Sequence, residues 1–360
     1  TLIRAELEAE AVPYAAVLPG QVGYIALVQF TRDCAEAFRQ RLIQLKAQAA
    51  LKGLIIDLRG NPGGLLSEAL EILNYFLPKG ELLLETRGRM PEANQKYYAQ
   101  MHPFEPTLPL IVLIDEGSAS ASEIVAGTLQ DLDRAVVMGR RSFGKGLVQV
   151  VRPLVENTQM KITVSRYYTP SGRCIQLIKT GGAARTFRTR NGRLVQEGTG
   201  ITPDIEVASY LPYTFREKVE PYFFYFLAQH RDQIPRDSAS LSVELPSPSF
   251  VQALIDSLRP YPSTYAQEAE MLLGEFQERI KESADVSRKV QELQEVLQTY
   301  RLDQLRSYME SMRVLVGQLR AYHGQGLRGE YNFLVARDPL IQQACELLVD
   351  MPRYERVLRP

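Results

Sequence analysis

The stretch 109-PLIVLIDEGSASASEI-124 predicts a strand, a tight turn and a helix in immediate succession. The apolar run from Leu110 to Ile114 is unbroken and of strand length, as in strands that are covered on both faces. Serines at 118, 120 and 122 stand where a helix N-cap is favoured, and Glu123 falls in the first turn, where it suits the helix dipole. The helix is expected to run from Ala121 to Leu132.

A serine on such a turn can act as a nucleophile. It is held at the edge of the sheet, and the neighbouring backbone N–H groups point into the same space. Ser120 is therefore a candidate nucleophile, and its hydroxyl needs a base that accepts the proton. The chain has three histidines, of which two lie in the C-terminal half and His102 precedes the strand in a Pro-flanked loop. A histidine base is disfavoured on these grounds, and a hydrolase that uses His102 stays an alternative.

Lys145 is the preferred candidate for the base. It lies between two glycines, with Phe143 and Leu147 as apolar flanks that could bury it. A buried lysine favours its uncharged form, which can accept a proton. A solvated surface lysine is the plainer alternative. The preceding glycines also fit the start of a phosphate-binding loop, but Gly146 stands where that loop needs Ser or Thr.

Strands and helices alternate along the first 210 residues. The patterns predict strands at 22–30, 53–58, 82–86, 110–114, 135–138, 147–151 and 161–168, and helices at 35–51, 65–77 and 121–132. This alternation predicts an α/β fold with a mostly parallel sheet and crossover helices. The turn Asn61-Pro-Gly-Gly64 and the Ser120 turn both follow the carboxyl end of a strand, so they should face one cleft. A plain tight turn is the alternative for Asn61 to Gly64.

These motifs together resemble one family, the carboxy-terminal processing peptidases, also called tail-specific proteases. Its members are serine proteases that use a Ser/Lys dyad in place of Ser/His/Asp. The segments that carry the resemblance are Asp57-Leu-Arg-Gly-Asn-Pro-Gly-Gly64, Gly117-Ser-Ala-Ser-Ala-Ser-Glu-Ile124, Gln130-Asp131, Arg134-Ala135, Phe143-Gly-Lys-Gly146 and Gln149. With 161–173 and 200–207, the resemblance covers roughly Thr1 to Val207, and it implies a crotonase/ClpP-like core.

The resemblance also implies roles for six residues. They are the nucleophile Ser120, the general base Lys145, the orienting residue Gln149, the oxyanion donors Gly64 and Ala121, and the acidic residue Asp131 as a possible support whose role we interpret as mainly structural. Positions four apart on a strand share a face, so Lys145 and Gln149 can lie side by side. The implied function is a serine endopeptidase that cuts proteins near their C-terminal tails through an acyl-enzyme, without a metal or cofactor.

Two alternatives to this function stay open. One is a catalytically silent member of the family that acts as a peptide-binding scaffold. The other is an acyl-CoA enzyme of the crotonase type, which also uses paired N–H groups to bind an oxyanion. The family acts on exported or membrane-bound proteins, so the resemblance implies an exported location, such as a bacterial periplasm.

The composition narrows the class of partner. The 360 residues include 42 basic and 42 acidic side chains, so there is no net charge that would favour nucleic acid or an anionic membrane. No apolar run is long enough for a membrane span. The three cysteines are few and widely spaced, which suggests neither a disulfide framework nor a zinc site. The expected partners are protein or peptide substrates.

Four regions are expected along the chain. Residues 1–11 resemble the end of a PDZ domain that this sequence lacks, or a linker, and the first residue, Thr1, suggests a processed or trimmed piece. Residues 12–210 form the Ser/Lys protease core, and prolines mark 211–263 as a linker or docking region. Residues 264–360 are helical. Their apolar spacing favours packing within the chain, and a homo-oligomer through these helices is the alternative.

Overall fold

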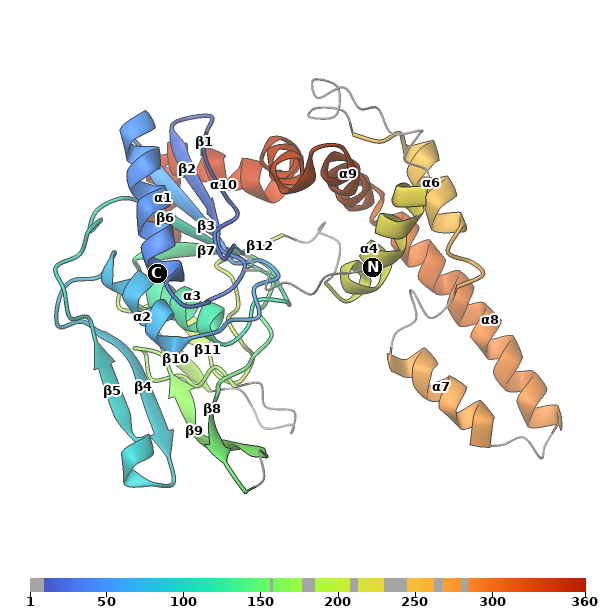
Figure 1. The fold of residues 1–360 in the computed structure, drawn as a ribbon, viewed down its shortest axis with the longest axis horizontal. Helices are drawn as coiled ribbons and strands as arrows, with labels where there is room; N and C mark the ends of the chain where they lie inside the picture. The colour runs from blue at the N-terminus through green and yellow to red at the C-terminus, as the bar shows by residue number, and fades with distance from the viewer. Residues whose placement is uncertain are drawn as a thin grey trace. The chain divides into compact units, whose positions relative to one another are not determined.

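The computed structural model describes residues 10–155, 158–176, 185–207, 213–229, 245–261, 268–279 and 284–360 (Figure 1). The chain forms two compact units. Unit 1 combines Thr1–Val207 with Gln343–Pro360, and unit 2 is Ala208–Gln342. The sequence boundary expected near residue 210 lies close to the end of the first segment of unit 1. The last eighteen residues, expected with the C-terminal helices, instead pack with unit 1.

A mostly parallel sheet forms the centre of unit 1. Its strands, in spatial order, are β1 (Tyr14–Leu18), β2 (Val22–Ala26), β3 (Gly53–Asp57), β6 (Leu110–Ile114), β7 (Ala135–Gly139) and β12 (Ile205–Glu206). Strand β1 pairs antiparallel with β2, and the other neighbours are parallel. All five residues of β2, β3, β6 and β7 are buried, as expected for strands covered on both faces. The predicted α/β class is confirmed.

Three helices pack on one face of this sheet. They are α1 (Cys34–Gln48), α2 (Leu66–Asn74) and α3 (Ala121–Asp131). Their buried side chains share one apolar core with every second residue of the strands, since alternate residues of a strand face the same side. The core residues include Phe38, Leu42, Ile72, Leu73, Val125, Leu129, Leu54, Ile56, Leu110, Val112 and Ile114. This packing fixes the turn between β6 and α3 at the carboxyl edge of the sheet.

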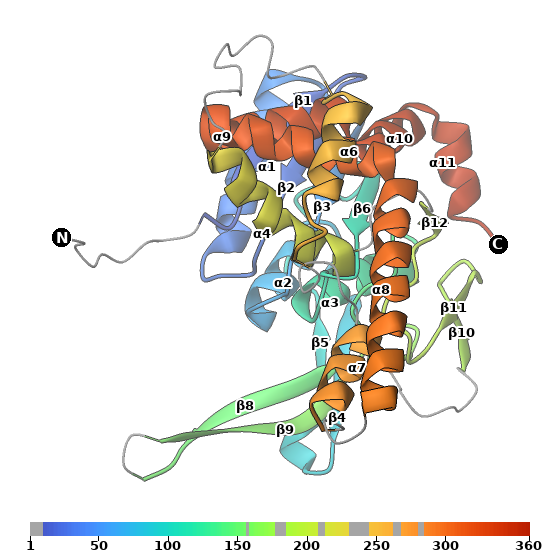
Figure 2. The ribbon, with the colours of Figure 1, turned by 90° about the vertical axis from the view of Figure 1, so that its right-hand side faces the viewer.

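A second, antiparallel sheet projects from unit 1. Its order is β5 (Gln95–Tyr98), β4 (Leu82–Gly88), β9 (Gln159–Tyr168) and β8 (Leu147–Pro153), with a 3-10 turn, Pro91–Ala93, between β4 and β5. Figure 2 shows β8 and β9 as a long ribbon that reaches away from the parallel sheet. A small hairpin joins β10 (Thr186–Arg188) and β11 (Leu194–Gln196). The sequence predicted β4, β8 and β9 as strands but placed no second sheet, because their pairing joins distant segments.

The C-terminal end of the chain completes unit 1. Helix α10 (Pro339–Val349) is followed by α11 (Met351–Val357). The hydroxyl of Tyr354 in α11 accepts a hydrogen bond from Leu110 N at 3.1 Å and donates to Leu110 O at 2.9 Å. Both backbone polar groups of Leu110, the N–H and the C=O, therefore have a hydrogen-bond partner at the start of β6. The C-terminal helix α11 thus supports the strand that leads to Ser120.

Unit 2 is helical. It holds α4 (Tyr213–Gln229), α6 (Pro248–Asp256), α7 (Glu268–Arg279), α8 (Ala284–Ser307) and α9 (Met309–Arg337). Val219, Phe223, Val251, Leu254, Leu305, Met312 and Val316 belong to its apolar core. The region 211–263, expected as a linker or docking region, contributes α4 and α6 to this core. Homo-oligomer formation through the C-terminal helices stays a prediction. In the described part of the chain, no helix is both long and apolar enough to cross a bilayer.

Candidate active site

Ser120 occupies the turn between β6 and α3 in a conformation that few non-glycine residues adopt. Its φ is 56° and its ψ is −109°. Such a backbone costs of order 1–3 kcal/mol and persists where the surrounding structure fixes it. A strained strand-to-helix turn of this kind presents a serine at the top of the sheet, which is the position of a nucleophile. The side chain is partly exposed, so a substrate can reach it.

Two backbone N–H groups, one in each of the turns that meet at Ser120, are available as donors. Within the described residues, neither Ala121 N nor Gly64 N has a hydrogen-bond partner. The neighbouring Gly63 N is already used, because it donates to Asn61 Oδ1 at 2.9 Å. Free N–H groups at a helix start can stabilise a developing oxyanion. The two donors expected from the sequence are therefore both unoccupied.

Asn61 holds the two turns against each other. Its backbone oxygen accepts from Ala119 N at 3.0 Å and from Ser122 Oγ at 2.9 Å. Its side-chain amide donates to Leu27 O at 2.7 Å. Asn61 is fully buried, so all of these bonds form away from water and are costly to leave unmade. The two turns are therefore in direct contact, and that they face one cleft stays a prediction.

Gly63 is required where the turns meet. Its φ is 94°, and a Cβ there would lie 2.6 Å from Ala119 O, 2.8 Å from Ala121 N and 2.9 Å from Ser120 Cβ. No side chain fits at that position without displacing the Ser120 turn.

Asp115 also links the two turns. Its Oδ1 accepts hydrogen bonds from Gly60 N at 2.8 Å and from Gly117 N at 2.9 Å.

The carboxylate of Glu123 links the Ser120 turn to the Lys145 loop. Its Oε2 accepts from Ser120 N at 2.9 Å and from Lys145 N at 2.8 Å. Its Oε1 accepts from Gly144 N at 2.7 Å and from Ser142 Oγ at 2.5 Å. Burial raises the pKa of Glu123, and these hydrogen bonds oppose that rise.

From the sequence, Glu123 was expected only to suit the helix dipole. The Ser-x-x-Glu spacing from Ser120 was the signal available, since a glutamate three residues after an N-cap can bond back to it. The bonds to the Lys145 loop depend on contacts between distant segments. The structure therefore adds Glu123 to the site as a residue that positions the two predicted catalytic segments.

Lys145 lies in the loop before β8, with its side chain exposed. The expectation of a buried amine is wrong for this structure. The flanking glycines provide no side chains to cover it, and Phe143 is itself 59% exposed. Among the described residues, the Lys145 amine makes no hydrogen bond or ion pair, so its bond to Ser120 is not formed here. Catalytic contacts are often loose in a free enzyme and tighten when substrate binds.

Gln149 lies on β8 and points to a different partner from the one expected. Its Nε2 donates to Thr163 Oγ1 at 3.3 Å on the neighbouring strand. The pairing of β8 with β9 shifts register between Val148 and Gln149. The extra residue at this shift is Val164 on β9, so the two-residue alternation of β8 itself is kept. Among the described residues, no hydrogen bond joins Gln149 to Lys145, and the orienting role of Gln149 stays a prediction.

Asp131 lies at the end of α3, in a buried ion pair. Its Oδ1 is 2.9 Å from a guanidinium nitrogen of Arg173, and its Oδ2 accepts from Ser171 N at 3.0 Å. The two side chains are 0% and 2% exposed. Asp131 therefore holds the 171–173 turn against α3. The alternative base, His102, is exposed in its loop.

Residues 21–207 match the family model described as Peptidase family S41. The chain belongs to peptidase family S41. The matched segment is slightly more than half of the chain and contains every predicted catalytic residue. This finding confirms the resemblance to the carboxy-terminal processing peptidases and supports the assignment of the parallel-sheet unit to the crotonase-like core of that family.

Curated relatives of this S41 chain carry consistent names. A carboxy-terminal-processing protease of Bartonella bacilliformis is 39% identical over 218 residues, which are 60% of this chain and 45% of the relative. The carboxyl-terminal-processing protease of Synechocystis is 40% identical over 153 residues, 42% of this chain and 35% of the relative. CtpB of Bacillus subtilis is 39% identical over 154 residues, which are 43% of this chain and 32% of CtpB. The matches thus span less than half of each relative.

Among solved structures, the chain is similar to a photosystem II D1 C-terminal processing protease, with 29% sequence identity and a TM-score of 0.43. The match covers 55% of this chain and 46% of the chain of that protease. The family model and the curated relatives, not this structural match, make the chain a homologue of serine peptidases of the S41 family.

Proposed function

We propose that this S41 chain is a serine endopeptidase that cleaves proteins near their C-terminal tails through a Ser120/Lys145 dyad. The observation that carries the proposal is the strained Ser120 turn, flanked by the free N–H groups of Ala121 and Gly64. A hydroxyl beside two preorganised donors suits attack on a carbonyl carbon, where negative charge develops on the oxygen.

Each of these residues has its own role in the proposed reaction. Lys145, in its neutral form, removes the proton of Ser120 as Oγ attacks the peptide carbonyl, and the oxyanion binds at the two N–H groups. Lys145 then protonates the leaving amine, and water hydrolyses the acyl-enzyme. The nitrogens of Ser120 and Lys145 lie within about 6 Å of each other because both bond to one Glu123 oxygen. This spacing supports a swing of the exposed lysine side chain onto Ser120. Gln149 would have to leave Thr163 in order to orient the amine.

The proposal includes a substrate class, protein C-terminal tails, and an exported location. The curated relatives are named for carboxy-terminal processing, which supports protein tails as substrates of this chain. The same resemblance suggests an exported location, such as a bacterial periplasm. Detection of the native protein in a periplasmic fraction, with a cytoplasmic marker excluded from it, tests the location.

A peptide-hydrolysis assay tests the chemistry. We expect Ser120→Ala and Lys145→Ala each to lower turnover by about a thousandfold or more, since dyad members act as a unit. We expect His102→Ala to keep activity within about twofold, because its exposed ring has no place in the reaction. Loss of turnover in His102→Ala with normal folding would instead support the histidine-based alternative.

A second measurement separates the enzyme from a silent peptide-binding scaffold. An activated peptidyl ester should acylate Ser120, and intact-mass spectrometry after acid quenching should show the added acyl group. Ser120→Ala should show none. An unmodified parent chain that still binds the peptide would support the scaffold. Binding of coenzyme A would favour the crotonase-type acyl-CoA alternative.

A further inference from the structure

The loop that carries Lys145 is bonded to distant parts of the chain through its backbone. Each of the five backbone N–H groups from Ser142 to Gly146 donates a hydrogen bond. In chain order, the acceptors are Ile201 O, Ser118 O, Glu123 Oε1, Glu123 Oε2 and Gln176 Oε1. The proposed peptidase chemistry and the support from Glu123 do not account for the last of these bonds, which Gln176 accepts.

Gln176 contacts the residue that follows Lys145. Its Oε1 accepts from Gly146 N at 3.0 Å, although 30 positions separate the two residues. Gly146 is buried, and a Cβ there would clash with Gln176 N, so the two backbones lie against each other. Tyr167 N also donates to Gly146 O at 2.8 Å. Since a buried N–H is unfavourable without an acceptor, the Gln176 side chain helps to determine where this end of the loop lies.

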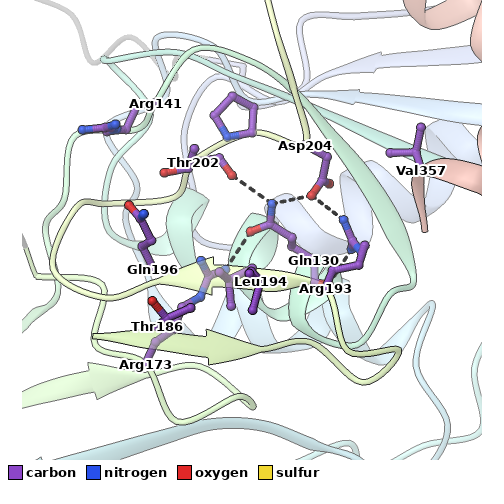
Figure 3. Close-up of a pocket in the computed structure, with 12 residues that line it drawn as sticks. Gln130, Arg141, Arg173, Thr186, Arg193, Leu194, Gln196, Thr202, Asp204 and Val357 are labelled. Carbon is purple, nitrogen blue, oxygen red and sulfur yellow. Dashed lines mark hydrogen bonds and ion pairs between the residues drawn. The ribbon is translucent and has the colours of Figure 1, made fainter. Parts of the chain in front are cut away.

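The segment that leads to Gln176 is fixed to helix α3. Arg173 pairs with Asp131 at 2.9 Å and donates to Gln130 Oε1 at 2.7 Å, and all three residues are buried. Figure 3 shows the bond from Arg173 to Gln130 in the wall of a cavity of about 720 Å³. Gln130 and Asp131 are the last two residues of α3, and Ser120 is its N-cap. The helix that begins at Ser120 therefore also holds the segment that carries Gln176.

Helix α3 thus supports the Lys145 loop at two points. From its first turn, Glu123 bonds to the Lys145 N–H. From its last turn, the ion pair with Arg173 holds the segment whose Gln176 bonds to the Gly146 N–H. Because the two bonds form at consecutive N–H groups, together they fix the direction in which the backbone leaves Lys145. A small displacement of a reacting group has a large effect on rate, so this direction matters for a base.

We propose that Gln176 is a positioning residue for the base Lys145. Its side chain acts through the bond to Gly146 N and not by contact with substrate, and the buried ion pair at the end of α3 keeps it in place. Gln176 thereby fixes the backbone from which the lysine side chain reaches Ser120. This role rests on the proposed Ser120/Lys145 chemistry.

Gln176→Leu removes the acceptor and keeps a side chain of similar size. In steady-state peptide hydrolysis we expect kcat to fall by about tenfold or more, because the base is displaced. KM should stay within about twofold, because no contact with substrate is lost. The matched control is Gln159→Leu, which changes an exposed glutamine on β9 and should alter neither constant. Parental kcat in Gln176→Leu would overturn the proposal.

Gln176→Glu keeps an acceptor oxygen for Gly146 N and adds a negative charge beside the Lys145 loop. We expect kcat at its best pH to stay within about threefold of the parent, since the bond is kept. The added charge favours the protonated lysine, so the pH of half-maximal turnover should rise by about half a unit or more. Glu123 is present in both chains and does not contribute to this difference. An unshifted pH profile would contradict a position beside the base, and this variant gives the test even if Gln176→Leu does not fold.

Hydrogen exchange tests the same bond without an activity measurement. Amides of residues 143–147 should exchange about tenfold faster in Gln176→Leu than in the parent, whereas those of Gln159→Leu should match the parent. Circular dichroism confirms that each variant is folded. Parental exchange in Gln176→Leu would show that Gln176 does not hold the loop.

Lys145→Ala separates this role from the proposed function. Parental turnover in Lys145→Ala would overturn both, since the lysine would then not be the base. An inactive Lys145→Ala chain, together with parental kcat and exchange in Gln176→Leu, would overturn the role of Gln176 alone. Loss of turnover in both variants, with KM unchanged in Gln176→Leu, is the result that we expect.

Discussion

The backbone nitrogens of Ser120 and Lys145 donate to the same oxygen, Glu123 Oε2, at 2.9 and 2.8 Å. One buried carboxylate thereby fixes the nucleophile turn and the base loop, although 25 positions separate them in the chain. In proteins that need accurate placement of reacting groups, a small displacement has a large effect on rate. Because it bonds to both segments, Glu123 is a positioning residue, and its effect on activity can be measured in a variant.

Glu123→Gln should reduce both activity and stability. The amide keeps the shape of the side chain but replaces one acceptor oxygen by an NH₂ group that faces N–H donors. We expect a loss of about 1–3 kcal/mol in the free energy of unfolding and a fall in kcat of about tenfold or more. Peptide-hydrolysis kinetics and urea unfolding provide the two measurements.

The matched control for this change is Glu92→Gln, in which an exposed glutamate is altered. It should change neither quantity by more than experimental error. A Glu123→Gln chain with parental kcat would show that the shared carboxylate does not position the dyad, even if the chain were less stable.

Gly63→Ala should disrupt the contact between the two turns. The added Cβ would meet backbone atoms of the Ser120 turn at 2.6 and 2.8 Å. Because backbone cannot move aside cheaply, the turn must shift, and the Ala121 N–H shifts with it. Removing one oxyanion donor costs about 10²–10³ in kcat, so we expect a loss in that range in steady-state kinetics.

Gly60→Ala separates this clash from simple backbone strain. Gly60 also has a positive φ, 67°, but a Cβ there meets nothing within 4 Å. We expect a stability loss of about 1 kcal/mol with nearly parental kcat. Equal loss of activity in the Gly60 and Gly63 variants would argue that strain, and not the contact with the Ser120 turn, is responsible.

The strand–turn–helix around Ser120 was predictable because its signals are local. An unbroken apolar run, small turn residues and an N-cap all lie within the sixteen quoted residues, and the structure has β6 and α3 where they were expected. The Asn61 to Gly64 turn was found for the same reason. The α/β class followed from the alternation of such local patterns.

What could not be predicted depends on contacts between distant segments. The sequence shows a glutamate at 123 but not the Lys145 loop that folds onto it. It shows strand patterns at β4 and β9 but not that they pair, nor that Gln149 bonds to Thr163 on the neighbouring strand. Tyr354 bonds to Leu110 across 244 positions, and no local pattern predicts such a contact. Burial of Lys145 was expected because Phe143 and Leu147 flank it in sequence, but Lys145 is exposed and Phe143 is itself 59% exposed.

Asp57→Asn should weaken the support of the Asn61 turn in a pH-dependent way. Asp57 accepts from Tyr24 Oη at 2.7 Å and from Arg59 at 2.6 Å. Burial alone raises the pKa of Asp57, but the Arg59 charge and these hydrogen bonds outweigh it and leave the pKa lowered. The stabilisation by the carboxylate is therefore present above the unfolded-state pKa and is lost as pH falls through the folded-state pKa.

At pH 7 we expect the asparagine variant to lose about 3–5 kcal/mol, because it removes the negative charge that pairs with the buried Arg59 guanidinium. Since the parent loses the same stabilisation in acid, the difference between the two chains should shrink below about pH 4. Urea unfolding at pH 7 and pH 3 measures it. A difference that stays constant across this range would contradict the lowered pKa.

Thiol reagents should leave the native chain and its activity unaffected. Burial, followed by the charge of Glu68, raises the pKa of Cys34 to about 12, and burial raises that of Cys345 to about 11. Only the thiolate reacts, and at pH 8 very few Cys34 side chains carry it. Iodoacetamide should therefore label native Cys34 slowly, with a rate that rises about tenfold for each pH unit between 8 and 10, whereas the urea-unfolded chain should be labelled readily. Mass spectrometry of the digested protein measures each site. Rapid labelling of native Cys34 at pH 8, or loss of peptidase activity upon labelling, would show an accessible thiolate and would reopen the choice of nucleophile.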